Sequence, residues 1–482
     1  MSCPRMWTHS AAATLSVLLL TACATNPVTG KRELSFLSEA QEIAIGKQTD
    51  AEVRREMGVY DHPELQRYVS DVGHRLAQLS HRPHLPWTFT VVDHQAVNAF
   101  ALPGGFIYIT RGILPFLDDE AELAGVLGHE IAHVTARHAA QQYTRATGGQ
   151  LGLIALGIFV PATRPLGDLS SAALSVAFLK YGRDDENESD RVGMEYAARG
   201  NWDPTGVPRF LSTLSRIDRL NERGVPNWLS THPEPGERVV ETQPLAAKLV
   251  SSGPNERNRD EYLNQIDGIV VGDNPKDGIV RGTAFLHPVL RFALEFPEGW
   301  DVTNTPAQVA AQEPGEKHFM LLQLVEQPRG RTAEEIAASS MRDAGFRLVD
   351  GSATTLNGLD AHVGLFHGSI RGVGAVVMRA AHIVHGRQVY LFGGFAPLDD
   401  FPRVDRAISE AIQTFRPLTA READDIRPNR LDFYTVRPGD TWQSIASRGG
   451  ALVRASDLAI MNNSEVNEQP KPGVRIKIVV AG

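Results

Sequence analysis

Cysteine is almost absent from this 482-residue chain, and its two cysteines, Cys3 and Cys23, lie within the first 23 residues. The rest of the chain can form neither a disulfide nor a cysteine-based metal site, so any metal must be held by histidine and carboxylate side chains. An excess of positive charge is also absent, because 48 basic and 57 acidic residues give a formal net charge of −9. Nucleic-acid binding normally requires a basic face, so the composition argues against such a partner.

The chain also lacks an apolar run long enough to cross a membrane. Residues 11–20 are apolar except for Thr14 and Ser16, and Arg5 precedes them. Ten residues are too few to span a bilayer, which needs about 20, but they suit the apolar region of a signal peptide. The apolar stretch at residues 151–160 is interrupted by glycines and stopped by Pro161. We therefore expect a signal peptide and no transmembrane segment.

The end of this apolar run resembles a bacterial lipobox, because residues 20–23 read LTAC. The resemblance implies cleavage before Cys23 and lipid modification of that cysteine, with acyl chains that anchor the mature protein to a membrane. Ala24 follows the cysteine where an aspartate would indicate inner-membrane retention, so the periplasmic face of the outer membrane is expected. The alternative is a secretory peptide whose cysteine is incidental.

The length predicts two to four domains. Helical periodicity dominates residues 35–250, with helices expected at 38–56, at 63–79 and from Asp118 or Asp119 past Arg137, and strands at 87–92 and 106–110. Residues 251–282 are rich in Gly, Asn, Asp and Pro, which indicates a domain boundary. Beyond it, strands are expected at 290–296, 319–325, 375–384 and 388–395, and helices at 333–344 and 401–415. Residues 296–300 also resemble the small sandwich domains related to the photosystem protein PsbP.

Residues 129–133 read HEIAH and lie within the long predicted helix. At about 100° per residue, His129 and His133 lie one turn apart on the same side, where both imidazoles can reach one ion at about 2.0–2.1 Å. Glu130 lies near that side but is angled away from the ion, so it can take a proton from a water on the metal. Two ordinary surface histidines are the alternative. His138 lies about 180° from His129 on the same helix, so we expect it to remain outside the site.

A catalytic zinc site needs a third protein ligand, and residues 181–190 form the strongest candidate segment. Glu186 and Asp190 are one helical turn apart. If Glu186 binds the metal, Asp190 can accept a hydrogen bond from the Nδ1–H of a ligand histidine and fix its tautomer. A solvated acidic helix face is the alternative.

Four segments together resemble the HtpX, Oma-type and BepA-like zinc metallopeptidases, the minigluzincin group: NPVTG at 26–30, NAFALPGG at 98–105, the helix at 121–138 and ENESD at 186–190. The resemblance spans residues 26–245 and implies that Glu186 is the third zinc ligand, although Ser189 stands where alanine is usual. Residues 98–108 resemble the edge strand that pairs with an extended substrate, which implies substrate binding by Asn98, Ala99 and Phe100. A plain hairpin is the alternative.

Thr231-His232-Pro233, followed by Arg238, resembles a further element of this family that lies near the metal. We expect His232 to approach the zinc from a loop, either as an added ligand that closes the site or as a donor to the tetrahedral oxyanion. A structural role is the remaining alternative. The glycine-containing apolar residues 148–165 suggest a lid over the cleft.

The last 50 or so residues predict a strand, a Pro-Gly turn, two helices and a closing strand. The segments YTVRPGDTWQSIA at 434–446, MNN at 461–463 and PGVRIKI at 472–478 resemble a LysM domain, which implies binding to the N-acetylglucosamine chains of peptidoglycan. Trp442 stands where leucine is commoner. A docking module without a glycan ligand is the alternative.

We therefore expect a multidomain α+β chain. Its parts are a lipoprotein signal peptide (1–22), a mainly helical gluzincin-type zinc peptidase domain with a small sheet (23–255), a linker (256–284), a mixed α/β sandwich domain of unknown role (285–420) and a LysM-like β-α-α-β domain (431–482).

The expected function is that of a zinc-dependent endopeptidase of the bacterial envelope with one Zn²⁺ per subunit. Glu130, Asp190 and His232 serve the chemistry, and His129, His133 and Glu186 hold the metal. The expected substrates are extended, misfolded or misassembled envelope proteins. The rival is a non-proteolytic chaperone-like or scaffolding lipoprotein that binds peptidoglycan, but a pure binding protein has no need of Glu130.

Overall fold

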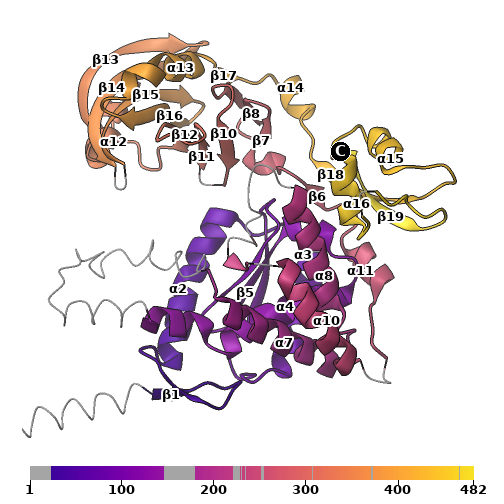
Figure 1. Cartoon of the computed structure of the whole chain (residues 1–482). Helices are drawn as coiled ribbons and strands as arrows, with labels where there is room; N and C mark the ends of the chain where they lie inside the picture. Colours follow the sequence, from indigo (N-terminus) through magenta and orange to yellow (C-terminus); the bar gives the residue numbers. More distant parts are fainter. Residues whose placement is uncertain are drawn as a thin grey trace, which may run out of the picture. The chain divides into compact units, whose positions relative to one another are not determined.

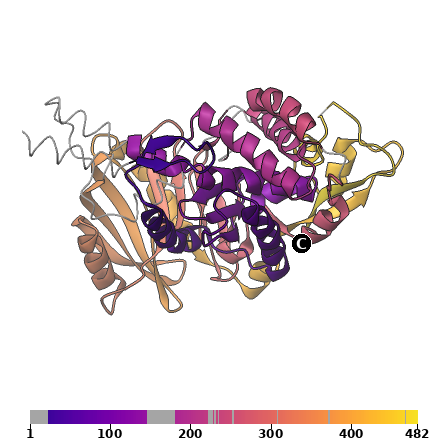
Figure 2. The ribbon, with the colours of Figure 1, turned by 90° about the horizontal axis from the view of Figure 1, so that it is seen from below.

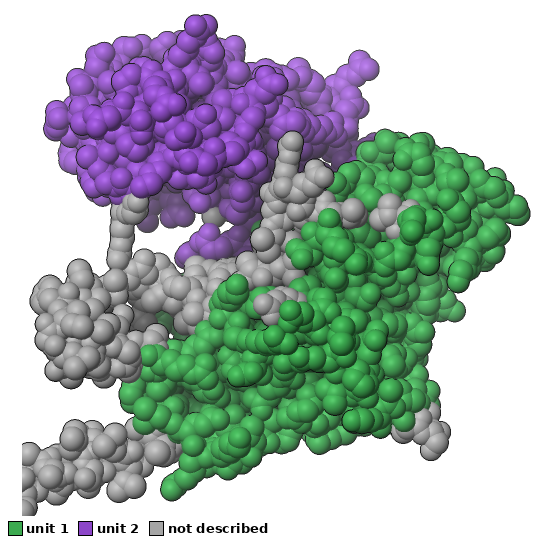
Figure 3. All heavy atoms as spheres, in the orientation of Figure 1, with its two compact units in different colours: residues 1–54, 58–269, 430–480 green, residues 55–57, 270–429, 481–482 purple. Residues whose placement is uncertain are grey.

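The computed structural model describes residues 23–145, 180–220, 228, 231–233, 235–250, 254–306, 308–370, 373–465 and 467–482 (Figure 1). The chain divides into two compact units, unit 1 with residues 1–54, 58–269 and 430–480, and unit 2 with residues 55–57, 270–429 and 481–482 (Figure 3). Within the described residues, no helix is long and apolar enough to cross a membrane. The predicted signal peptide (1–22) and lid (148–165) lie outside these residues.

A small sheet forms part of the core of unit 1. It contains β3 (Thr88–Val92), β5 (Phe106–Thr110) and β4 (Ala99–Leu102) in that order, with β3 parallel and β4 antiparallel to β5. The 87–92 and 106–110 strand predictions are thus confirmed. A separate antiparallel pair joins β1 (Cys23–Thr25) to β2 (Arg32–Leu34). In the three-stranded sheet, whose order is β3-β5-β4, strand β4 lies at an edge.

Helices pack around this sheet in the part of unit 1 that ends at residue 269. The helices are α2 (Glu39–Met57), α3 (Pro63–Gln78), the 3-10 helix η1 (Arg111–Phe116), α4 (Glu120–Thr135), α7 (Arg183–Arg199), α8 (Gly206–Leu220), α10 (Pro235–Leu249) and α11 (Arg259–Gln265), and residues 138–145 are also helical. The predicted stripe on α3 is confirmed, because Leu65, Val69, Val72 and Leu76 are all buried. Residues 256–284, where the sequence predicts a linker, include α11, whose Tyr262 and Leu263 are buried.

Helix α4 packs against β4 and β5 of the sheet and against helices α3, α7 and α8. Asp119 caps its N-terminus by accepting a hydrogen bond from the Glu122 backbone N–H at 3.0 Å. Every residue from Glu120 to Thr135 is buried. Because the helix is buried on all sides, its polar side chains must find hydrogen-bond partners or ligands inside the protein.

The predicted continuation of α4 past Arg137 is wrong. The helix ends at Thr135, and Arg137 adopts a left-handed conformation with φ of 62°. The Arg137 guanidinium donates hydrogen bonds to Glu42 Oε1 at 2.6 Å and to the Leu37 carbonyl at 2.6 Å. These tertiary contacts hold a residue in a conformation that ends a helix, and they redirect the chain immediately after the motif.

Unit 2 contains two antiparallel sheets and two main helices. The larger sheet has seven strands in the order β10-β11-β12-β16-β15-β14-β13, and the smaller has four in the order β17-β9-β8-β7. Their bounds are β7 (Ile279–Arg281), β8 (Ala284–His287), β9 (Phe292–Glu295), β10 (Asp301–Asn304), β11 (Gln308–Gln312), β12 (Phe319–Leu324), β13 (Arg347–Leu356), β14 (Leu359–Ile370), β15 (Gly374–His385), β16 (Gln388–Pro397) and β17 (Arg416–Pro417). The helices are α12 (Ala333–Asp343) and α13 (Phe401–Gln413), and short elements are β6 (Val270–Val271), η2 (Pro275–Asp277) and α14 (Ala420–Asp424).

The central part of the seven-stranded sheet is buried on both faces, as the alternation along β15 shows. Val377 and Ala381 belong to a core shared with β9 and α13, whereas Val376 and Met378 belong to a second core shared with α12. Successive side chains of a strand point to opposite faces, so each face is covered by a different helix. The predicted helices at 333–344 and 401–415 correspond to α12 and α13.

The C-terminal module comprises residues 429–481 and has the predicted strand–helix–helix–strand order. Its elements are β18 (Asn429–Thr435), α15 (Trp442–Arg448), α16 (Ala455–Met461) and β19 (Arg475–Ala481), with β18 and β19 adjacent in one sheet. Val436, Trp442, Ile445, Leu458 and Ile476 form its small core. Residues 430–480 of the module belong to unit 1, and Figure 2 shows the module in yellow beside helices of that unit.

Candidate metal centre

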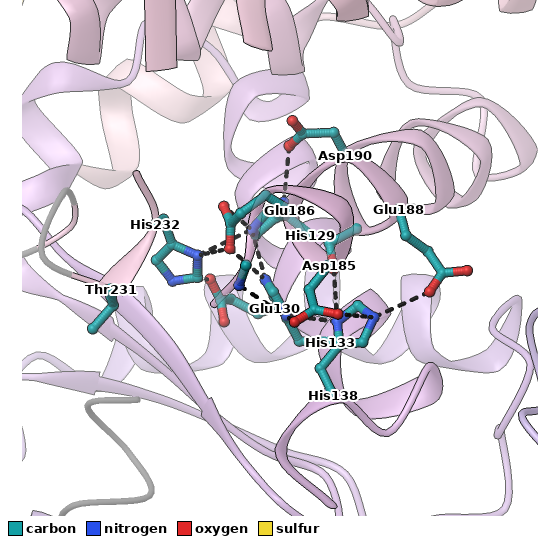
Figure 4. A network of polar contacts seen from close by, with 12 residues as sticks. His129, Glu130, His133, His138, Asp185, Glu186, Glu188, Asp190, Thr231 and His232 are labelled. Carbon is teal, nitrogen blue, oxygen red and sulfur yellow. Dashed lines mark hydrogen bonds and ion pairs between the residues drawn. The ribbon is translucent and has the colours of Figure 1, made fainter. Parts of the chain in front are cut away.

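Four side chains from three parts of unit 1 converge in its buried interior (Figure 4). His129 and His133 come from α4, Glu186 comes from the first turn of α7, and His232 comes from the segment that precedes α10. Each offers one ligand atom, and these four atoms lie within 4.8 Å of one another. All three ligands predicted from the sequence are thus brought together, and His232 joins them.

The distances between these atoms fit a single metal ion. His129 Nε2 lies 3.0 Å from His133 Nε2, His133 Nε2 lies 3.4 Å from Glu186 Oε1, and His129 Nε2 lies 3.7 Å from Glu186 Oε2. Ligands at about 2.0–2.1 Å from a tetrahedral ion are about 3.4 Å apart, which matches this spacing. Glu186 is fully buried, and its two carboxylate oxygens face the Nε2 atoms of the two histidines. The donor set, two imidazoles and a carboxylate, is one that binds divalent transition metals.

The close crossing of α4 and α7 places Glu186 opposite the two histidines. A Cβ atom built on Gly128 would lie 2.9 Å from the Gly193 carbonyl oxygen, and one built on Gly193 would lie 2.7 Å from His129 N. Only glycine at both positions allows this backbone separation. The two helices therefore present their ligands at short range.

Asp190 holds His129 from the side opposite to the cluster. Its Oδ1 lies 2.9 Å from His129 Nδ1, so this nitrogen is assigned the proton and Nε2 keeps its lone pair for a metal. Arg238 in turn donates to both oxygens of Asp190, from Nε at 2.8 Å and from Nη2 at 2.7 Å. Burial acts to raise the pKa of Asp190, but Arg238 and His129 outweigh it and hold that pKa below its usual range.

His138 takes part in the site, so the prediction that it stays outside is wrong. Its Nδ1 lies 2.9 Å from His133 Nδ1, and its Nε2 lies 3.1 Å from Glu188 Oε2. The left-handed Arg137 turns the chain back toward the site after α4 ends, which no helical projection could anticipate. Glu188 and His138 thus orient His133 much as Arg238 and Asp190 orient His129.

Glu130 is fully buried and neither of its carboxylate oxygens has a hydrogen-bond partner among the described residues. Its Oε1 lies 3.6 Å from His232 Nε2. Burial raises the pKa of Glu130, and the nearby His232 and His129 only partly offset this effect. A buried carboxylate that has a raised pKa and no hydrogen-bond partner among the described residues, beside a cluster of possible metal ligands, has the properties of a general base.

His232 lies between Glu186, Glu130 and an aromatic wall. Its Nδ1 is 2.9 Å from Glu186 Oε1 and 3.3 Å from His129 Nε2. The Trp228 ring stacks on its imidazole at a centroid distance of 4.3 Å and an interplanar angle of 25°. Burial acts to lower the pKa of His232, but Glu186 and Glu130 outweigh it and raise that pKa.

The predicted substrate-binding residues lie on and beside the edge strand β4. Ala99 and Phe100 belong to β4, and Asn98 precedes it, with its backbone bonded to Thr110. The Asn98 side-chain amide is buried, and neither its Oδ1 nor its Nδ2 has a hydrogen-bond partner in the described structure. A small hollow is lined by Ala101 and Leu102 of β4 together with His133 and Tyr181.

Some residues of the site could not be assigned a role from the sequence. Arg238 was noted only as part of a family element, yet its guanidinium bridges Asp190 and Glu186, with Nη1 at 2.5 Å from Glu186 Oε2. The Tyr181 ring stacks on His133 at 3.9 Å. The only available signal for Arg238 was its position six residues after His232.

The predicted lipidation residue, Cys23, is the first residue of β1 and belongs to unit 1.

Comparison with known proteins places this site in a family. Residues 63–245 match the family model described as peptidase family M48. The beta-barrel assembly-enhancing protease of Yersinia pestis is 31% identical over 231 residues, which are 46% of this chain and 47% of that protein. The mitochondrial metalloendopeptidase OMA1 of Arabidopsis thaliana is 31% identical over 192 residues, 39% of this chain and 38% of that protein. The matched region thus spans half or less of the length of these relatives.

A similarity to solved structures is weaker. The solution structure of PsbP from the cyanobacterium Synechocystis is 11% identical and covers 29% of this chain with a TM-score of 0.24, which supports no conclusion about unit 2. The family match, in contrast, includes α4, α7 and His232, so it covers every residue of the buried cluster. The chain therefore contains a metallopeptidase domain of peptidase family M48, which occupies residues 63–245.

Proposed function

We propose that this protein is a zinc-dependent endopeptidase of the bacterial cell envelope that hydrolyses misfolded or misassembled envelope proteins. The observation that carries the proposal is the buried Glu130 carboxylate beside the cluster of His129, His133 and Glu186, for which the described residues provide no hydrogen-bond partner. Zinc suits two imidazoles and a carboxylate with a fourth position available for water or substrate.

Each residue of the cluster then has a defined task. A bound zinc ion would lower the pKa of a water molecule and polarise the scissile carbonyl. Glu130 accepts the proton of that water, and its raised pKa lets it hold the proton and pass it to the leaving amine. Asp190 and His138 keep the two ligand histidines in the tautomers that leave Nε2 free. Arg238 neutralises Glu186 and Asp190, which would otherwise repel each other across a buried site.

The edge strand supports an extended polypeptide as the substrate. Strand β4 pairs with β5 on one side and lies at the edge of the three-stranded sheet. Strand addition recognises a backbone with little regard for side chains, which suits a protease of unfolded proteins. The unpaired amide of Asn98 adds a buried donor and acceptor beside that edge.

The envelope location rests on the lipobox-like sequence that ends at Cys23 and on relatives named beta-barrel assembly-enhancing proteases. We propose that a lipid at Cys23 anchors the protein to the outer membrane, and that the C-terminal module is a LysM-like unit that docks on peptidoglycan. Membrane fractionation of a Cys23→Ser variant and co-sedimentation of the full chain with peptidoglycan test these two points.

The central experiment compares the wild type with Glu130→Gln, using casein as a generic unfolded substrate. Glutamine fits the same volume but cannot accept the proton, so hydrolysis should fall by orders of magnitude while zinc content stays at one per chain. A chelator should abolish the wild-type activity, and added zinc should restore it. Equal hydrolysis by both proteins would contradict the mechanism. An inactive wild type that still suppresses aggregation would favour the chaperone-like alternative.

A further inference from the structure

A lysine of the C-terminal module is fully buried against the peptidase domain. Lys477 lies on β19, has 0% exposure, and its Nζ donates a hydrogen bond to the Leu117 carbonyl at 2.7 Å. The same Nζ lies 3.4 Å from Asp118 Oδ1. Lysine is almost never fully buried unless its charge is paired, so this contact marks a specific interaction and not a loose surface of the module.

The position of that contact links the module to the metal site. Leu117 and Asp118 immediately precede Asp119, the N-cap of α4. The same helix carries His129, Glu130 and His133, and all of its residues are buried. Lys477 therefore fixes the start of the one helix that supplies two metal ligands and the general base.

Charged groups of the peptidase domain complete the arrangement around this helix start. Arg209 donates to both oxygens of Asp119 at 2.7 and 3.1 Å, and Arg257 donates to Asp119 Oδ2 at 2.8 Å. The Asp118 backbone N–H donates to Glu122 Oε2 at 2.8 Å. Lys477 is the cation that the C-terminal module supplies to this cluster, while the other cations come from the peptidase side.

The module holds Lys477 rigidly. The Lys477 N–H donates to Asn462 Oδ1 at 2.7 Å, and Asn462 Nδ2 donates back to the Lys477 carbonyl at 2.9 Å. The side chain of Asn462 thus clamps the backbone of the lysine on both sides. The tip of the side chain is held by its own contacts with the Leu117 carbonyl and Asp118.

Further contacts seat the module on the same region of unit 1. Helix α16 packs against α8 and η1. Arg216 of α8 donates to the Asn463 side chain and to Glu465 Oε1 at 3.5 Å. Leu431 exchanges backbone hydrogen bonds with Gly268 and Ile269 at 3.0 and 2.9 Å. These contacts flank Lys477, so the lysine lies within a continuous interface.

We infer that the C-terminal module is a brace of the peptidase domain, and that Lys477 is a positioning residue for the metal-site helix. Undocking the module removes the cation from the start of α4 and lets the helix shift, which weakens metal binding and slows hydrolysis. A ligand that pulls the module away would act on the protease through the same contact. The inference rests on the proposed peptidase function.

The test uses the full chain with Lys477→Met, which keeps the aliphatic stem and removes the charge. The matched control is Lys471→Met, an exposed lysine of the same module. Zinc affinity is measured by competition with a chelator, hydrolysis by kcat and KM on a quenched peptide, and backbone order by hydrogen exchange of residues 118–135 in the metal-free protein.

Lys477→Met should lower zinc affinity and kcat by about 10-fold and leave KM unchanged. This is the low end of the loss that follows substitution of residues that orient metal ligands. Exchange should quicken at the start of α4 and not in α2 or α3. Lys477→Arg, which restores a cation, should recover most of the loss, and Lys471→Met should behave as the wild type. If Lys477→Met fails to fold, the comparison of Lys477→Arg with Lys477→Gln replaces it.

Unchanged affinity, exchange and kcat in a folded Lys477→Met protein would overturn the inference and leave the module a separate attachment. Faster exchange spread evenly over unit 1 would also overturn it, because it would show a general loss of stability. An inactive wild type with normal zinc binding would instead count against the proposed peptidase function, and the exchange and affinity data would still decide the role of Lys477.

Discussion

Gly128 and Gly193 meet where α4 and α7, the two helices that carry His129, His133 and Glu186, cross. A Cβ on Gly193 would lie 2.7 Å from His129 N and 2.9 Å from Gly128 C, both of which are backbone atoms that cannot swing away. This contact lets Glu186 and Asp190 of α7 reach the two histidines of α4. The geometry of the cluster thus depends on residues that contribute no ligand.

Gly193→Ala should therefore damage the site from a distance. The added methyl forces α4 and α7 apart, at a cost of about 1–3 kcal/mol for overpacking, and it displaces Glu186 from the histidines. We expect zinc affinity to fall by about 10-fold or more and Tm to fall with it. Gly182→Ala, at the start of the same helix, is the control, because its Cβ would meet only Asp185 Oδ2 at 3.6 Å. Equal behaviour of the two variants would show that the crossing tolerates a larger separation.

Substitutions of Glu186 and of Asp190 should have different effects on zinc binding. Glu186→Ala deletes a ligand, so zinc should be lost on dialysis. Asp190→Asn keeps all ligands but weakens the hold on His129 Nδ1, so affinity or turnover should fall by about 10–100-fold. Metal content by mass spectrometry and activity at saturating zinc separate the two effects. Asp184→Ala, an exposed position in the first turn of α7, should change neither. Retention of full zinc by Glu186→Ala would mean that the third ligand lies elsewhere.

The sequence predicted this site better than it predicted the path of the chain around it. The spacing of His129, Glu130 and His133 depends only on helix geometry, and α4 is a regular helix as far as Thr135. His138 was misplaced because helical periodicity assumes that the helix continues, whereas Arg137 is held in a left-handed conformation by Glu42, about 95 residues away in sequence. Contacts of that range leave no local pattern in the sequence.

The same limit applies to unit 2. Strand β13 went unpredicted because its residues are exposed except for Leu356, so no alternation of apolar and polar residues marks it. Strand β16, in contrast, has eight of its ten residues buried and was predicted as residues 388–395. Arg238 shows the limit at the site, since its role depends on two carboxylates that come from another helix.

Unit 2 should lose stability in mild acid through His382. This residue is fully buried on β15, its Nε2 lies 2.8 Å from Ser340 Oγ, and its Nδ1 has no hydrogen-bond partner in the described structure. Burial lowers the pKa of His382 from 6.5 to about 4. Below pH 6.5 the unfolded chain therefore binds the proton more readily than the folded one, and the free energy of unfolding should fall by up to about 3 kcal/mol as the pH drops to 4.

Hydrogen exchange of the β15 amides at pH 7, 6, 5 and 4, corrected for intrinsic rates, measures this loss. His382→Gln removes the titrating group, so its protection should depend less on pH than that of the wild type, whatever its absolute stability. His367→Gln, a half-buried histidine on the adjacent β14, is the control and should keep the wild-type pH dependence. Identical profiles for the wild type and His382→Gln would show that His382 does not titrate in this range.

His232 can act in two opposite ways, and one substitution separates them. Its imidazole lies 2.9 Å from Glu186 Oε1 and 3.6 Å from Glu130 Oε1, with Trp228 stacked on its face. If His232 occupies the fourth ligand position, it closes the site, because a catalytic zinc must keep that position open for water or substrate. His232→Ala should then raise the basal hydrolysis of casein and promote self-cleavage.

If His232 instead donates a hydrogen bond to the oxyanion, its loss should lower turnover by about 10²–10³-fold at equal zinc content, as the loss of one such donor typically does. Glu186 and Glu130 raise the pKa of His232 against the effect of burial, which favours the protonated form, in which both ring nitrogens can donate. Trp228→Phe is the matched control, since it keeps an aromatic face on the ring and all groups of the cluster. Zinc content and kcat, measured together on both variants, decide between the two roles. An unchanged kcat in His232→Ala would assign the residue a structural role, in which the Trp228 ring and the Glu186 carboxylate hold its imidazole.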